Sequence, residues 1–200
     1  MFHLHHHKFP ISAPHGKNSV VSVDKISITK EKNMHYLSVN EIVITNLTSE
    51  QKTEIENLLD SEDPFGAVFP VPTEVSGDYE QESQWKECNW GTEGISYDCC
   101  GLVTESNFGE KSDPSTVIFR CDTFNYAPSG IVCNLSSKYP DATCILRTTT
   151  DDEPSNGGEE TIYRNGRLVK EKRYSFRNKK AFYDFLYNLY GCPDFSFSKD

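Results

Sequence analysis

The chain lacks any long hydrophobic run. Apolar residues make up 36% of its 200 residues, and no apolar segment approaches the roughly 20 residues that a helix needs to cross a bilayer. Its first ten residues, MFHLHHHKFP, contain no continuous apolar region of the kind found in secretory signals. We therefore expect a cytoplasmic protein with no membrane partner, large enough for one domain with a sizeable core.

Metal-binding cysteine pairs are also missing. The seven cysteines include no C-x-x-C pair and are odd in number, so we interpret them as buried or half-buried thiols in a reducing cytosol. The His-Leu-His-His-His pattern near the start would chelate a transition metal weakly. A flexible His-rich arm over residues 1–18, or an artificially added terminus, explains it better. We predict no metal site and no cofactor.

Motifs of common enzymes are absent as well. The sequence has no G-x-x-x-x-G-K-[ST], no G-x-G-x-x-G, no H-E-x-x-H and no G-x-S-x-G. A nucleophile and base pair would need Cys99 or Cys100 beside His35, the one histidine outside the arm, and nothing local supports it. We predict no catalytic residues and no enzyme activity, although an uncharacterised enzyme with a cleft near Trp90 is a third possibility.

The clearest structural signal that is present runs from residue 90 to residue 150. Residues 116–124 are β-branched and aromatic, which predicts a strand, and Pro128 then suits the first turn of a helix. Residues 142–150 predict another strand. The helix between the two strands has an apolar face made of Ile131, Val132, Leu135 and Tyr139.

The segments before this unit predict a hairpin and a helix. Residues 20–29 and 34–46 alternate like strands around the turn KEKN. Thr48 and Gln51 have the spacing of a capping box, which predicts a helix over residues 49–59.

The segments that follow this helix are less regular. We expect residues 65–72 to form a short strand that ends in prolines and residues 73–87 to form a polar loop. Residues 95–105 predict a strand, and residues 107–115 a loop.

The C-terminal part predicts a hairpin and a helix. Asn165-Gly166 is a strong signal for a type I′ turn within residues 161–172, and Asn178 can cap a last helix. The apolar stripe of that helix consists of Phe182, Phe185, Leu186 and Leu189. We assign residues 19–200 to a single α+β domain.

Several motifs resemble a known family in the same order along the chain. These are SVNEIVITNLTSEQKTEI, FPVP, the Trp-Gly-Thr that begins at Trp90, and TFNYAPSG followed by LSSKYPDATCILRT. Together they resemble the Api-like family of phage- and plasmid-encoded proteins over roughly residues 39–173. Glu93-Gly94-Ile95 and Asn125-Tyr126-Ala127-Pro128-Ser129 depart from the family pattern.

The resemblance implies a fold and an origin, but no catalytic residues. It implies a ferredoxin-like antiparallel sheet with two helices on one face, in a protein of a mobile element and so in the cytoplasm of a bacterial host. We expect this core to be elaborated by N-terminal and C-terminal hairpins and a C-terminal helix.

Acidic residues are concentrated in one part of the chain. Residues 49–115 hold 16 acidic and 3 basic residues. This stretch either forms a solvated acidic surface or imitates a phosphate backbone and occupies a nucleic-acid-binding groove on another protein. The candidate protein-binding residues are Asp78, Glu80, Glu82, Glu87, Asp151, Asp152 and Glu153.

Basic residues are concentrated near the C-terminus. Residues 161–200 hold 9 basic and 4 acidic residues, interleaved with aromatic residues as in surfaces for single-stranded nucleic acid. In a hairpin these aromatics can instead face the core, and the net charge of −10 disfavours nucleic acid. The candidate nucleic-acid-binding residues are Arg173, Arg177, Lys179 and Lys180.

These observations lead to one functional hypothesis and one alternative. We predict a phage- or mobile-element-encoded interaction protein that binds and inhibits a host protein or nucleoprotein complex of bacterial defence through its acidic face. The alternative is a nucleic-acid-binding accessory protein that uses the basic C-terminal surface. The oligomeric state is open, because exposed edge strands can pair across a dimer.

Overall fold

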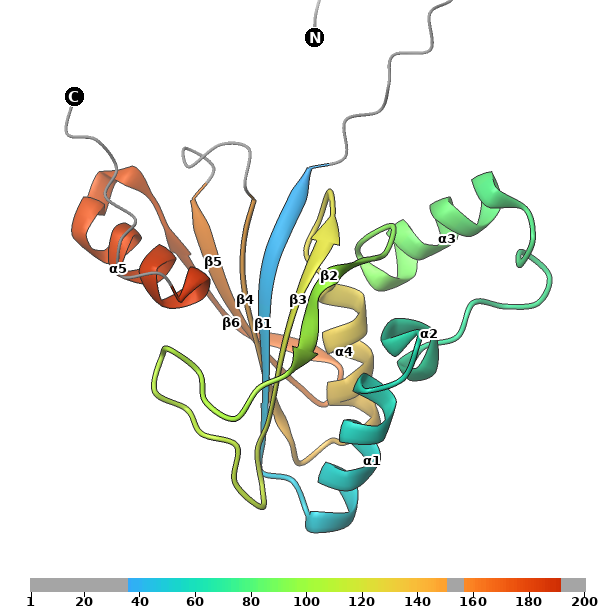
Figure 1. Cartoon of the computed structure of the whole chain (residues 1–200), viewed down its shortest axis with the longest axis horizontal. Coiled ribbons are helices and arrows are strands. Elements are labelled where there is room, and N and C mark those ends of the chain that lie inside the picture. The colour runs from blue at the N-terminus through green and yellow to red at the C-terminus, as the bar shows by residue number, and fades with distance from the viewer. Residues whose placement is uncertain (1–35, 151–156, 192–200) are drawn as a thin grey trace, which may run out of the picture. The chain divides into compact units, whose positions relative to one another are not determined.

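The computed structural model describes residues 36–150 and 157–191. These residues form a six-stranded antiparallel sheet with the strand order β2-β3-β1-β4-β5-β6 (Figure 1). The strands are β1 (Leu37–Thr45), β2 (Ile95–Leu102), β3 (Val117–Phe124), β4 (Thr143–Thr150), β5 (Gly158–Arg164) and β6 (Arg167–Tyr174). The helices are α1 (Ser49–Leu59), α2 (Pro64–Val68), α3 (Tyr79–Trp90), α4 (Ser129–Lys138) and α5 (Lys179–Tyr190). The predicted α+β class and antiparallel sheet are confirmed.

The central strand of the sheet is β1. It pairs with β3 on one side and with β4 on the other, which confirms the strand predicted within residues 34–46. Both edges of β1 are therefore occupied, which makes it an interior strand of the sheet. Residues 20–29, the other half of that hairpin, lie outside the described residues.

The larger core lies on one face of the sheet, under α1, α2 and α4. Successive side chains of a strand point to opposite faces, so Ile42 and Ile44 of β1 face these helices together. Ile131, Val132 and Leu135 of α4 meet them and are completely buried. The apolar face predicted for this helix is therefore confirmed.

The other face of the sheet is covered by α5 (Figure 1). Its predicted stripe, Phe182, Phe185, Leu186 and Leu189, forms a second buried cluster. At Gly158 of β5 a Cβ would lie 2.2 Å from the Phe185 ring, so the helix packs directly on the backbone there. Helices α1 and α4 share one face of the sheet, and the short α2, which was not predicted, lies with them, whereas the predicted C-terminal helix α5 covers the opposite face.

Local capping signals fixed several element boundaries as predicted. Thr48 and Gln51 form the capping box at the start of α1, with N···O distances of 3.2 and 2.9 Å. Asn165 and Gly166 have positive φ angles of 46° and 68° in the β5–β6 turn. Asn178 Oδ1 accepts a hydrogen bond from the backbone N–H of Ala181 at the start of α5.

Two segments differ from the prediction. The strand expected over residues 65–72 is instead α2, because Asp63 caps it and Pro64 occupies its first turn. The loop expected over residues 73–87 contains most of α3, which Asp78 caps. In both cases an Asp just before the helix was the overlooked signal.

The connection from β2 to β3 is irregular, as expected for residues 107–115. It contains one isolated bridge between Glu105 and Lys111. Strand β2 ends at Leu102 rather than at residue 105. In the two ranges that the structure describes, no helix has the length and apolar character needed to cross a membrane.

Candidate functional site

Helix α3 buries the smallest fraction of its residues among the described α-helices. Of its 12 residues, Trp90 alone is buried, and Tyr79 at its start is 77% exposed. Asp78 Oδ1 accepts hydrogen bonds from the backbone N–H groups of Glu80 and Gln81, both at 3.1 Å. The N-terminal half of α3 is therefore held by its cap and faces solvent, extending away from the sheet (Figure 1).

An aromatic cluster anchors the C-terminal half of α3. The ring of Trp90 meets Phe65 edge-on at 5.9 Å and Trp85 at 6.1 Å between centroids. Trp85 in turn meets Phe69 at 5.3 Å, and Trp90 Nε1 donates a hydrogen bond to the Phe69 carbonyl oxygen at 2.8 Å. These contacts join α3 to α2 and to the main core.

Two glycines allow α3 to touch α4. At Gly130 a Cβ would lie 1.9 Å from the carbonyl oxygen of Asn89, far closer than any side-chain atom can come. Gly91 ends α3 with a φ of 88°, and a Cβ there would lie 2.7 Å from the carbonyl oxygen of Ala127. Both positions require glycine because the two backbones are in direct contact.

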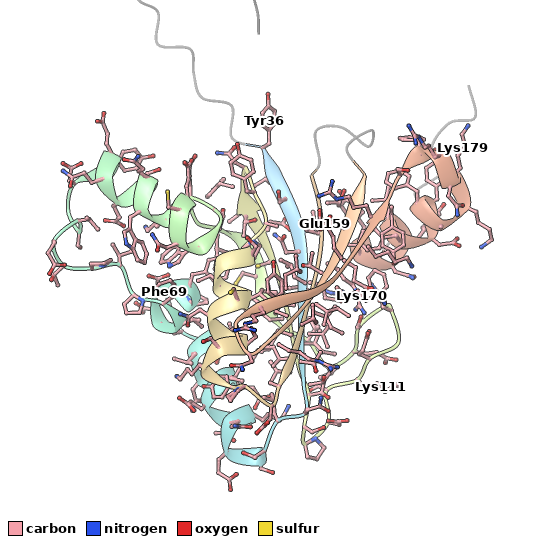
Figure 2. The ribbon with its side chains drawn as sticks, turned by 180° about the vertical axis from the view of Figure 1, so that it is seen from behind. Tyr36, Phe69, Lys111, Glu159, Lys170 and Lys179 are labelled. Atoms are coloured by element: carbon pink, nitrogen blue, oxygen red, sulfur yellow. The ribbon has the colours of Figure 1, made fainter. Side chains whose placement is uncertain are left out.

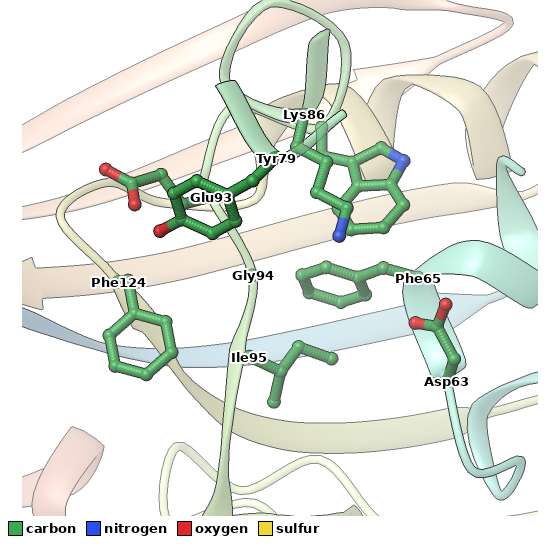
Figure 3. A pocket seen from close by; sticks show the side chains of 9 residues that line it. Asp63, Phe65, Tyr79, Lys86, Glu93, Gly94, Ile95 and Phe124 are labelled. Carbon is green, nitrogen blue, oxygen red and sulfur yellow. The ribbon is translucent and has the colours of Figure 1, made fainter. Parts of the chain in front are cut away.

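A pocket lies at the base of α3 (Figure 3). Its volume is about 310 Å³. Apolar and aromatic side chains form most of its wall, and charged groups of both signs complete the lining. The lining residues are Asp63, Phe65, Tyr79, Lys86, Trp90, Glu93, Gly94, Ile95 and Phe124.

Lys86 places one ammonium group inside this pocket. Its Nζ lies 5.1 Å from the centre of the Trp90 ring and 2.6 Å from Glu82 Oε1. The hydrogen bond with Lys86 lowers the pKa of the Glu82 carboxyl. The Trp90 face thus already holds a cation, and that cation is neutralised by Glu82.

Two carboxylates meet at the other side of the pocket. Glu93 Oε1 accepts a hydrogen bond from Asn125 Nδ2 at 2.6 Å. Desolvation, followed by the hydrogen bond to Glu93 and repulsion from it, raises the pKa of the Glu87 carboxyl. Two like charges in contact favour a nearby cation.

The predicted acidic residues have different roles on α3. Asp78 is the helix cap, Glu82 pairs with Lys86, and Glu80 and Glu87 are exposed. Asp151, Asp152 and Glu153 lie outside the described residues. The structure therefore brings four of the seven candidates together on one helix.

The predicted basic residues surround the end of β6 and the start of α5. Arg173 Nε lies 2.5 Å from Glu171 Oε1, and Lys180 Nζ lies 2.6 Å from Asp184 Oδ2. Arg177 and Lys179 form no ion pair with the described part of the chain. Two of the four candidates are therefore already partly neutralised.

A row of charges that has no signature in the sequence crosses the sheet. Glu41 of β1 is fully buried and lies opposite Arg120 of β3 and Arg147 of β4, while Arg147 lies opposite Glu160 of β5. Glu41 accepts hydrogen bonds from Arg120 Nη2 at 2.8 Å, from Arg147 Nη1 at 2.9 Å and from Ser106 Oγ at 2.7 Å. The strand registers that align these residues cannot be read from the sequence.

Arg147 is the most heavily bonded member of this row. It pairs with Glu110 at 2.5 Å and with Glu160 at 2.9 Å, and its guanidinium lies 4.1 Å from the centre of the Phe108 ring. Burial alone would lower its pKa, but its carboxylate partners raise the pKa overall. The row therefore joins β3, β1, β4 and β5 through side chains, and the buried charges of Glu41 and Arg147 are satisfied by hydrogen bonds.

The described cysteines differ in burial. Cys121 and Cys144 are buried, Cys100 and Cys133 are half-buried, and Cys88 is exposed, which corrects the prediction for Cys88. Burial raises the pKa of Cys100, the opposite of what a nucleophilic thiolate needs. His35 and the side chain of Cys99 lie outside the described part. Among the described residues, no group of three His, Cys, Asp or Glu side chains is placed to hold a metal ion.

No family model, curated protein or solved structure matches this chain at a significant level.

Proposed function

We propose that this protein is an interaction protein that binds and inhibits a bacterial defence complex, with α3 as its contact surface. The observation that carries the proposal is Tyr79, which is 77% exposed on an acidic helix anchored at its other end. Exposed tyrosines are favoured as interface anchors. Glu80 and Glu87 beside it would face a basic partner, such as a nucleic-acid-binding groove.

The arrangement of charge supports this proposal. Acidic α3 belongs to the side of the sheet that α1, α2 and α4 cover, whereas the basic start of α5 lies on the other side. Figure 2 shows Phe69, near α3, and Lys179, on α5, at opposite sides of the molecule's sheet. Such a field steers a basic partner toward α3. Binding is favoured over catalysis because Lys86, the one basic group lining the pocket, is paired with Glu82.

We also propose a ferredoxin-like core and an origin in a phage or plasmid, as in the Api-like family. Two features support the core. The strands β4, β1, β3 and β2 are neighbours in that order, and all of these pairs are antiparallel. Helices connect β1 to β2 and β3 to β4. β5, β6 and α5 would then be additions to this core.

The proposed function is tested by affinity capture from lysate of the bacterial host, with and without nuclease. The test variant is Tyr79→Ala combined with Glu80→Lys, which leaves the Asp78 cap and the Glu82–Lys86 pair intact. Lys179→Gln on the opposite side is the matched control. We expect wild type and control to capture one defence protein stoichiometrically after nuclease treatment, and the test variant to lose it. Capture that is unaffected by the test variant would overturn the role of α3.

A second candidate function, nucleic-acid binding, is favoured by the start of α5. Arg177 and Lys179 precede or begin the helix, where its dipole attracts anions, and Phe176 beside them is 38% exposed. If this function is correct, the double variant Arg177→Gln with Lys179→Gln weakens binding to a single-stranded oligonucleotide and reduces its salt dependence. Glu80→Gln should leave both unchanged.

A further inference from the structure

The pocket at the base of α3 offers two kinds of group in one place. Tyr79, Phe124 and Ile95 give it an aromatic and apolar wall, while Glu93 adds a carboxylate to the same lining (Figure 3). Lys86 and Asp63 stand at the other side of the cavity (Figure 3). A guest that fits must therefore combine a flat surface for stacking with a positive charge.

The charges around the pocket favour a cationic guest. The lining holds two carboxylates, Asp63 and Glu93, and one basic group, Lys86. Two further carboxylates adjoin it, because Glu82 pairs with Lys86 and Glu87 interacts with Glu93. Lys86 and Glu82 neutralise each other. The Glu87 and Glu93 carboxylates remain in contact and repel each other, so a cation placed beside them would relieve this repulsion.

The protein itself holds a guanidinium in a similar environment. Arg147 stacks on the Phe108 ring at 4.1 Å and pairs with the carboxylates of Glu110 and Glu160. A planar guanidinium suits both contacts, because it stacks on aromatic faces and bonds carboxylates through two N–H groups at once. A lysine ammonium is a compact point charge and uses the stacking surface less well.

We propose that this pocket receives an arginine side chain of the bound protein partner, with its guanidinium between the Tyr79 and Phe124 rings and paired with Glu93. Lys86 stays on the Trp90 ring, and repulsion from its ammonium group confines the guanidinium to the side of the pocket where Glu93 lies. This inference rests on the proposed function in one respect, namely that the arginine belongs to a protein. The pocket's preference for a guanidinium is a property of this chain and can be measured without the partner.

The experiment is an NMR titration of the whole protein with N-acetyl-arginine amide. N-acetyl-citrulline amide is the matched control ligand, because it has nearly the same shape and no charge. The reporters are the Trp90 indole N–H and the Gly94 amide. We expect saturable shifts with the arginine compound and about tenfold weaker binding of the citrulline compound, as loss of one charge-assisted contact implies.

Three variants make the result specific. Glu93→Gln, which can still accept the hydrogen bond from Asn125, should weaken arginine binding about tenfold. Lys86→Gln removes the resident cation and should strengthen it. Glu80→Gln, on the same helix but outside the pocket lining, should leave it unchanged. Opposite effects at Glu93 and Lys86 cannot arise from a general loss of folding.

Three outcomes would overturn the inference: equal binding of the two ligands, unchanged binding in Glu93→Gln, or no shift of Trp90 at the solubility limit of the arginine compound. The proposed function can fail independently of this inference, and the two experiments distinguish the two failures. If lysate capture depends on Tyr79 and Glu80 but the titration shows no binding, α3 remains the contact surface and the arginine pocket is wrong. If the titration shows binding but lysate capture does not depend on Tyr79 and Glu80, the pocket's preference for a guanidinium stands and the role of α3 as contact surface is wrong.

Discussion

At the scale of single residues, the row of charges across the sheet has the largest expected effect on stability. Glu41 is completely buried and bonded to both Arg120 and Arg147. A buried ion pair adds little net stability compared with an apolar pair, but removal of one partner leaves an uncompensated charge. Because a shift of one residue would turn every member of the row to the other face, the row also specifies the register of the strands.

The first prediction concerns Glu41. Glu41→Gln keeps the shape of the side chain but leaves two arginines without their shared carboxylate, so we expect the free energy of unfolding to fall by about 3–5 kcal/mol. Denaturant unfolding measures this loss. The control is Glu105→Gln, because Glu105 forms an exposed ion pair with Lys111 and should cost less than about 1 kcal/mol. Equal losses in the two variants would contradict this account.

The second prediction concerns pH and the Glu87 carboxyl. Its pKa is raised in the folded protein, so the stability linked to its protonated form is present below the unfolded pKa and is lost as pH rises through the folded pKa. Glu87→Gln should therefore have a higher Tm than wild type at neutral pH. The difference should close below the ordinary glutamate pKa of about 4.3.

A double-mutant cycle gives the control for this pH effect. In a Glu93→Gln background the repulsion is gone and only the desolvation of Glu87 remains, so Glu87→Gln should change Tm less at neutral pH than it does in the wild type. A Tm difference that is independent of both pH and residue 93 would show that the two carboxylates do not interact.

At the scale of elements, α3 is a helix attached at one end. Trp85 and Trp90 anchor it in the aromatic cluster, and Gly91 and Gly130 allow its contact with α4. An isolated helix of 12 residues is marginal in water. The position of α3, and with it the pocket, therefore depends on this junction.

The third prediction tests the α3–α4 junction. Helix propensity alone would make Gly130→Ala stabilising by about 1 kcal/mol. The new Cβ would lie 1.9 Å from the Asn89 carbonyl oxygen, and this clash makes the substitution destabilising instead. We expect the free energy of unfolding to fall by about 1–3 kcal/mol. Hydrogen exchange should accelerate in α3 more than in β1. Gly101→Ala, where nothing lies within 4 Å of the new Cβ, is the control, and stabilisation by Gly130→Ala would contradict the packing.

Elements marked by an apolar period, a capping box or an Asn-Gly turn were predictable from the sequence. The capping box of α1, the Asn165-Gly166 turn and the stripe of α5 each depend on neighbours in the sequence. Helix α3 was missed because a polar helix with two anchoring tryptophans has no apolar period. The pocket combines Phe65, Tyr79 and Phe124 from distant segments, so only tertiary structure could place them together.

At the scale of the whole described molecule, charge is divided between the two sides of the sheet. The acidic α3 belongs to one side and the basic start of α5 to the other. The net charge of −10 is therefore an average over an acidic side and a more basic side. A basic partner would be attracted to the acidic side, where α3 lies. If the proposed function is correct, the partner contacts α3.

The most direct test is photo-crosslinking in the host cell. A p-benzoylphenylalanine replaces Tyr79 in one variant and Phe176, at the start of α5, in the other. We predict a single protein adduct at position 79 that resists nuclease, and none at position 176. An adduct at position 176 alone, or one that nuclease removes, would contradict the account and favour the nucleic-acid-binding alternative.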